Sequence, residues 1–109
     1  MNKYFSNKIL LALRNHAEEK APNEMCGFIV DDKFIPVKNK ADDPEANFKL
    51  SGKDFIEASM QGEIKCIVHS HNNCDWVSEA DQKEQLKHNI PFCVVFLRNN
   101  HYYNIVIVS

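Results

Sequence analysis

Residues 64–81, with the sequence IKCIVHSHNNCDWVSEAD, determine the expected fold because they combine a strand, a histidine pair and a helix start. The apolar run 64–68 is typical of a central strand. His69 and His71 follow at its C-terminal end, where sheets usually expose functional groups. The segment 78–81, SEAD, fits the first turn of a helix that begins with a serine cap. A strand that leads through a loop into a helix predicts a mixed fold.

The flanking sequence supplies the other elements of this fold. The predicted helices cover residues 4–20, the segment from a Ser51 cap to an end at Gly62, and residues 78 to 88–89, where Leu86 faces inward. The predicted strands cover residues 26–30, 33–37, 92–97 and 102–108, with a further short strand around Phe48 and Leu50. We therefore expect one domain over residues 1–109, of the α/β (α+β) class. Its core is a single mixed sheet of about five or six strands flanked by helices.

Composition excludes two broad classes of partner. Thirteen basic residues against fifteen acidic ones give a net charge of -2, without the basic block of a nucleic-acid binder. The longest apolar runs, 9–13 and 92–97, fall far short of the roughly 20 residues that a membrane span requires. No signal-peptide pattern is present at the N-terminus, and the four cysteines form no CxxC pair. We expect a cytoplasmic protein with free thiols that binds neither nucleic acid nor membrane.

The histidine pair carries the expected chemistry. Side chains alternate along a strand, so His69 and His71 project from the same face. Asp81 lies ten residues beyond His71, where a strand-loop-helix connection can fold it back over the strand end. Two imidazoles and a carboxylate with an open fourth position form a catalytic zinc arrangement, which lowers the pKa of water to about 7. Glu24, just before the first strand, is the candidate general base, and the Ser78 hydroxyl could stabilise an oxyanion.

These residues together resemble the JAMM metalloproteases, also called the MPN or JAB family. That pattern has a Glu near the first strand, then His-Ser/Thr-His, then Ser-x-x-Asp. The matching segments here are PNEMCG at 22–27, HSH at 69–71 and SEAD at 78–81, and the order of elements is also similar along nearly the whole chain. The resemblance implies a cytidine deaminase-like layered fold. It also implies zinc (Zn²⁺) ligands at His69, His71 and Asp81, acid/base catalysis by Glu24 and oxyanion support by Ser78.

Within this family, SEAD and the later segment 90–92, IPF, are most similar to the JAMM domain of lambda-like phage tail assembly proteins and their bacterial relatives. There the domain is commonly fused to a cell-wall peptidase of the NlpC/P60 class. The resemblance implies a zinc-dependent peptidase or isopeptidase with a protein or peptide substrate, acting in tail assembly or in processing of a protein tail. A phage tail protein or an NlpC/P60 peptidase is the partner it implies. Two departures are Asn72, where the family usually has Pro, and a loop of residues 72–77 that is one residue shorter than usual.

Each assigned role has a simpler alternative. Ser78 could act only as a helix cap, Asp81 only as a charge that complements the helix N-terminus, and Glu24 only as a solvated loop residue. Cys74 or Asp75 could reach the metal, and a Cys74 thiolate in the fourth position would close the site to water. The alternative function is a non-catalytic assembly or scaffold module that binds a phage tail component.

Overall fold

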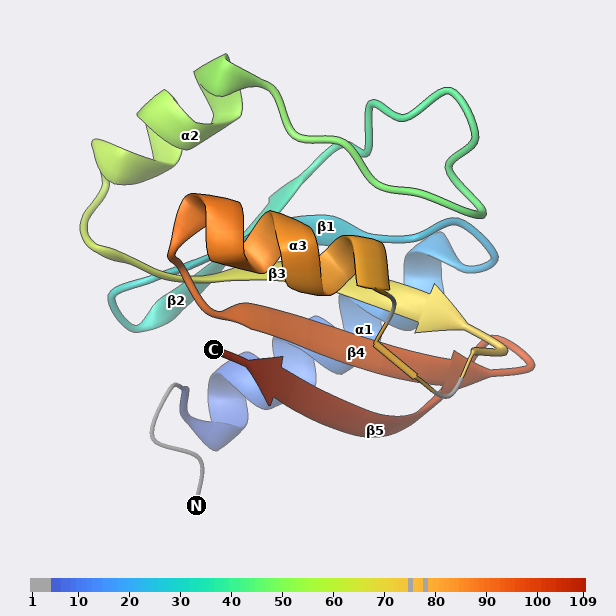
Figure 1. Cartoon of the computed structure of the whole chain (residues 1–109). Helices are drawn as coiled ribbons and strands as arrows, with labels where there is room; N and C mark the ends of the chain where they lie inside the picture. The colour runs from blue at the N-terminus through green and yellow to red at the C-terminus, as the bar shows by residue number, and fades with distance from the viewer. Residues whose placement is uncertain (1–4, 75, 78) are drawn as a thin grey trace.

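The computed structural model describes residues 5–74, 76–77 and 79–109, which form a five-stranded sheet with three helices (Figure 1). In chain order the elements are α1 (Asn7–Lys20), β1 (Cys26–Val30), β2 (Lys33–Val37), α2 (Gly52–Ser59), β3 (Ile64–Asn72), α3 (Glu79–His88), β4 (Phe92–Arg98) and β5 (His101–Val108). The strand order is β2-β1-β3-β4-β5. Only the β3–β4 pair of this sheet is parallel, and α3 connects its two strands. The predicted α+β class with a single mixed sheet is confirmed.

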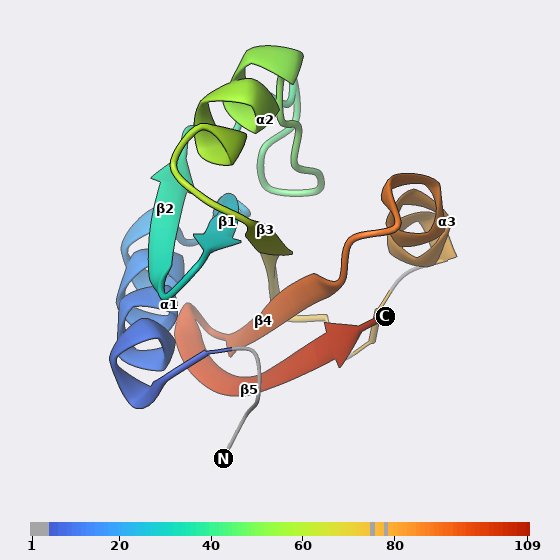
Figure 2. The ribbon, with the colours of Figure 1, turned by 90° about the vertical axis from the view of Figure 1, so that its left-hand side faces the viewer.

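The two faces of the sheet carry separate apolar clusters. Helix α1 packs on one face, where its buried residues Ile9, Leu13 and Ala17 contact side chains of β1, β3 and β4. Helices α2 and α3 lie on the opposite face (Figure 2). The apolar cluster there includes Phe28, Ala58, Ile67 and Phe92. Since β3 lies at the centre of the sheet, its side chains reach both layers.

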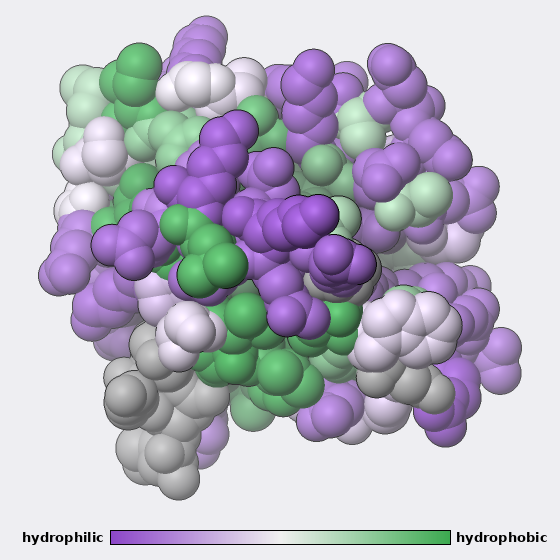
Figure 3. All heavy atoms as spheres, in the orientation of Figure 1, coloured by the Kyte–Doolittle hydropathy of each residue, from purple (hydrophilic) through white to green (hydrophobic). Residues whose placement is uncertain are grey.

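Two expectations, the short strand at Phe48 and Leu50 and the inward position of Leu86, were wrong. Phe48 and Leu50 are not in a strand, and their alternation arises because this loop packs both side chains against the α2-side cluster. Strand β3 extends through Asn72, so both histidines lie near its C-terminal end, as predicted. Leu86 is 75% exposed, because the inward stripe of α3 is formed by Asp81 and Gln85, four residues apart. Figure 3 accordingly shows mainly hydrophilic side chains over α3.

Local sequence explains where the helices start. Helix α1 begins at Asn7 and leaves Phe5 and Ser6 outside it, because the Ser6 side chain caps the helix by accepting a hydrogen bond from the Ile9 amide. At α2, Ser51 and Asp54 form a reciprocal capping box. Within the described ranges, no helix has both the length and the apolar character needed to cross a membrane.

Candidate metal centre

Strand β3 supplies the two imidazoles of the site. As the alternation of side chains predicts, His69 and His71 both face the layer of α2 and α3. His69 is fully buried, His71 is 7% exposed, and their ring centroids are 5.0 Å apart. Phe48 stacks on His69 with centroids 4.2 Å apart and an interplanar angle of 14°, which fixes the plane of that imidazole.

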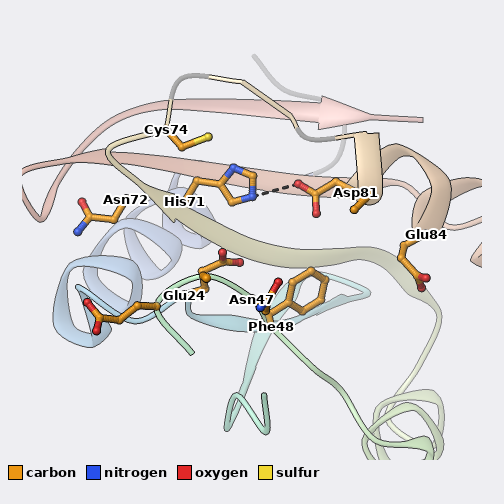
Figure 4. A pocket seen from close by; sticks show the side chains of 11 residues that line it. Glu24, Asn47, Phe48, His71, Asn72, Cys74, Asp81 and Glu84 are labelled. Atoms are coloured by element: carbon orange, nitrogen blue, oxygen red, sulfur yellow. Dashed lines mark ion pairs between the residues drawn. The ribbon is translucent and has the colours of Figure 1, made fainter. Parts of the chain in front are cut away.

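Helix α3 brings a carboxylate to the same point. Asp81 lies in the first turn of α3, and its Oδ2 is 3.2 Å from His69 Nε2 and 3.0 Å from His71 Nε2. Figure 4 shows the Asp81 carboxylate directed at His71 from the opposite wall of the pocket. One carboxylate oxygen therefore faces both imidazole nitrogens.

Glu24 reaches the site through the register between β1 and β3. Cys26 pairs with His69 in this antiparallel ladder, and the Ser70 amide donates to the Met25 carbonyl at 3.1 Å. The Ser70 hydroxyl also accepts a hydrogen bond of 2.8 Å from the Met25 amide. One step further along this register, Glu24 lies across from His71, and residues directly opposite one another share a face of the sheet. Accordingly, Glu24, His69 and His71 each offer a ligand atom, and these atoms lie within 4.8 Å of one another.

Burial and neighbouring charges shift the pKa values of the two carboxyl groups in opposite directions. Burial raises the pKa of Glu24 to about 7, with Asp81 raising it further and His71 opposing the rise. Burial also acts to raise the pKa of Asp81, but hydrogen bonds and attraction from both imidazoles hold it far below its ordinary value. Asp81 is therefore an anion at neutral pH, whereas Glu24 can hold or release a proton there.

The two imidazoles also differ. Burial lowers the pKa of His69, which favours the neutral ring that a metal ligand requires. Burial acts the same way on His71, but the carboxylates of Asp81 and Glu24 outweigh it and raise the pKa of His71. His71 Nδ1 lies 3.2 Å from the Trp76 carbonyl oxygen, an interaction that leaves Nε2 as the nitrogen that faces Asp81.

The donor set fits a transition-metal cation. Within the described part of the chain, Nδ1 of the buried His69 has no hydrogen-bond partner, and Nε2 has the Asp81 carboxylate, 3.2 Å away. Buried polar atoms normally have a partner, and this imidazole has the nitrogen donors that a metal ion could use. Two imidazole nitrogens and a carboxylate oxygen around one point form a set that zinc accepts. A pocket of about 460 Å³, lined by Glu24, His71 and Asp81 among others, opens beside them.

The structure brings four of the five predicted site residues together, whereas Ser78 lies outside the described residues, as does Asp75. Cys74 lines the pocket, and its thiol donates to the Trp76 carbonyl at 3.4 Å.

The sequence analysis did not identify Phe48 and Ser70 as residues of the site. Ser70 had a usable signal, since it stands between two histidines on a strand and must point to the opposite face. Phe48 had none, because its position depends on how a long loop packs.

A family model described as prokaryotic homologs of the JAB domain matches residues 6–107. Two curated relatives are both named tail tip assembly protein K. The one from Escherichia phage lambda is 43% identical over 47 residues, covering 42% of this chain and 24% of the relative. The one from Escherichia phage N15 is 32% identical over 68 residues, covering 59% of this chain and 28% of the relative. The chain thus spans about a quarter of the length of the curated relatives it matches.

Two solved structures share the fold. The solution structure of protein DSY2949 from Desulfitobacterium hafniense has a TM-score of 0.69 and 19% identity, covering 94% of this chain and 79% of that chain. A solution structure of a protein from Salinibacter ruber has a TM-score of 0.62 and 17% identity, covering 94% and 78%. At these identities the likeness concerns the arrangement of elements.

Proposed function

The chain belongs to the family of prokaryotic homologues of the JAB domain, and from this premise we propose that it is a zinc-dependent peptidase or isopeptidase. The observation that carries the proposal is the approach of one Asp81 oxygen to two imidazole nitrogens, at 3.2 and 3.0 Å, beside a glutamate whose pKa is raised to about 7. A structural zinc site would need no such titratable neighbour, whereas hydrolysis needs a base that works at neutral pH.

In this proposal, His69 Nε2, His71 Nε2 and Asp81 Oδ2 hold the zinc ion. When bound, zinc lowers the pKa of water at the site and polarises a carbonyl oxygen. The buried neutral His69 and the anionic Asp81 are already in the protonation states that a cation requires. Phe48 covers one face of the His69 ring and excludes water from it.

Glu24 is the proposed proton carrier. Its carboxylate takes a proton from the attacking water and passes it to the amine that leaves, so that one residue serves as base and then as acid. Glu24 and His71 both line the pocket, and their ligand atoms lie within 4.8 Å of each other, which supports this role (Figure 4). Ser78 is proposed to donate its hydroxyl to the oxyanion that forms at the attacked carbonyl.

The setting of the reaction is proposed from the relatives. Both curated relatives are named as tail tip assembly proteins, so we propose that the substrate is a protein or peptide of a phage or prophage tail and that the protein acts in the cytoplasm, where tails are assembled. A phage tail protein or an NlpC/P60 peptidase is the proposed partner. The word "assembly" in the names of both relatives also supports a second candidate, a non-catalytic module that binds a tail component.

Zinc content and turnover, measured on the same preparations, test this function. A diverse peptide library is digested with wild-type protein, and mass spectrometry of the new amino termini reveals which bonds are cut. We expect about one zinc per chain. Glu24→Gln should keep the zinc and lose about 10²- to 10⁴-fold in rate. His71→Ala should lose the zinc, whereas Glu19→Gln, whose side chain is 70% exposed, should retain both zinc and activity.

Two results would reject the enzyme. Wild-type protein that binds no zinc would show that the site is not a zinc site. Unchanged cleavage by Glu24→Gln would show that Glu24 is not the general base. Stable capture of one tail protein by wild-type and Glu24→Gln alike, without new amino termini from the library, would favour the assembly module instead.

A further inference from the structure

Four asparagines join the end of β3 to the turn between β4 and β5. Asn72 donates through Nδ2 to Asn100 Oδ1 at 2.7 Å, and its own Oδ1 accepts from the Asn100 amide at 3.1 Å. Asn73 Oδ1 accepts from the Asn99 amide at 2.8 Å, and the Asn73 amide donates to the Leu97 carbonyl at 2.8 Å. We call Asn72, Asn73, Asn99 and Asn100 the asparagine clamp.

The backbone explains why asparagine suits these positions. Asn99 and Asn100 form a two-residue turn between the paired residues Arg98 and His101, with φ of 50° and 69°. Such a turn needs two left-handed residues, which asparagine tolerates, and it leaves both turn amides pointing away from the ladder. Asn73, with φ of 61°, turns the chain out of β3 just after the last β3–β4 pair. Two consecutive side chains thereby satisfy both turn amides.

The clamp lies at the start of the loop that orients His71. Three residues beyond Asn73, the Trp76 carbonyl oxygen lies 3.2 Å from His71 Nδ1 and also accepts the Cys74 thiol at 3.4 Å. A carbonyl that accepts from one ring nitrogen keeps the proton there and leaves the other nitrogen free for a metal. The Trp76 carbonyl, together with Asp81 at 3.0 Å from Nε2, is therefore a contact that orients the His71 ring.

We propose that the asparagine clamp positions the loop after β3, so that the Trp76 carbonyl holds His71 with Nε2 available as a metal ligand. The inference rests on the zinc site of the proposed function and adds positioning residues to it. His69, by contrast, is oriented by the stacked Phe48, so the two imidazoles are fixed by unrelated parts of the chain.

The test uses aspartate substitutions at neighbouring positions, which change the charge equally. Asn73 contributes an acceptor through its side chain, so Asn73→Asp keeps that contact. Asn72 acts as both donor and acceptor, so Asn72→Asp removes the donor that the Asn100 Oδ1 atom accepts from. Asn73→Gly keeps the left-handed backbone and deletes the acceptor. Asn89→Gly, at another left-handed position beyond α3, is the matched control.

Zinc affinity of the full chain, measured by competition with a fluorescent chelator, is the main readout, with the thermal midpoint of the zinc-free protein beside it. We expect Asn73→Gly and Asn72→Asp to weaken zinc binding by about tenfold or more. Asn73→Asp and Asn89→Gly should bind zinc as wild type does. If Asn73→Gly fails to fold, the difference between the two aspartate variants decides.

The failures of the two proposals have different signatures. Equal zinc affinity in wild type, Asn73→Gly and Asn72→Asp, with only the thermal midpoint reduced, would overturn the clamp as a positioning device and leave the proposed function intact. Wild-type protein that takes up no zinc would overturn both.

Discussion

Replacing Glu24 by Gln should stabilise the metal-free protein above neutral pH and leave its stability almost unchanged in acid. The Glu24 side chain is buried, and burial raises its pKa from 4.5 to about 7. Between these values the unfolded chain has released the proton while the folded protein still holds it. The stability that this carboxyl contributes is therefore fully present below about pH 4.5 and is lost as the pH rises toward 7.

The size of the effect follows from the same two values. Each tenfold step in proton affinity is worth about 1.4 kcal/mol, so the interval from 4.5 to about 7 corresponds to an upper limit of roughly 3 kcal/mol in the free energy of unfolding. The glutamine of the variant has nearly the same shape as the glutamate and never ionises. We therefore expect Glu24→Gln to exceed wild type by about 1–3 kcal/mol at alkaline pH, since relaxation and water entry reduce the upper limit.

Urea unfolding in the presence of a chelator, repeated across this pH interval, measures the difference. Glu19→Gln is the control, because it makes the same substitution at a side chain that is 70% exposed. A gain for Glu24→Gln that is constant over the whole interval, or larger in acid than in base, would refute the reasoning. Loss of stability at alkaline pH would refute it as well.

Two further substitutions test the surroundings of the site. Phe48→Ala removes the ring that stacks on His69 at 4.2 Å, and we expect it to cost about 1–3 kcal/mol of stability in urea unfolding and to weaken zinc binding in the chelator competition. Gly27→Ala would place a Cβ against the Ile35 carbonyl oxygen and 2.8 Å from Phe34 Cε1, so we expect a loss of about 3 kcal/mol or more, seen as a lower thermal midpoint by circular dichroism. Wild-type stability of either variant would contradict the packing described here.

The part of the site that sequence alone predicted is the part that depends on local geometry. His69 and His71 share a face because alternation along a strand is a property of the strand itself. The place of Asp81 in the first turn of α3 follows from the helix-start pattern around it. In both cases the deciding interactions lie within a few residues, so the pattern could be read before the fold was known.

The remainder depends on contacts between distant segments. The loop that carries Phe48 has no periodic signal of its own, and its packing on His69 is decided by the space that α2 and β3 leave. Leu86 was expected to face inward because apolar residues usually do, yet α3 turns Asp81 and Gln85 toward the sheet. A polar site beneath a helix reverses the usual pattern of burial, and sequence periodicity cannot show where this happens.

The register of β1 on β3 brings Glu24 to the imidazoles and also makes ionisation of its carboxyl group unfavourable. Because Cys26 pairs with His69, Glu24 must lie across from His71 on the same face, where Asp81 and burial both act against its ionisation. A one-residue shift in the β1–β3 register would make ionisation of Glu24 easier, but it would also turn Glu24 to the opposite face of the sheet. The two hydrogen bonds between Met25 and Ser70 oppose that shift. The raised pKa of Glu24 is therefore a consequence of the same pairing that brings the carboxyl group to the imidazoles, and stability cannot be recovered there without moving the proposed base.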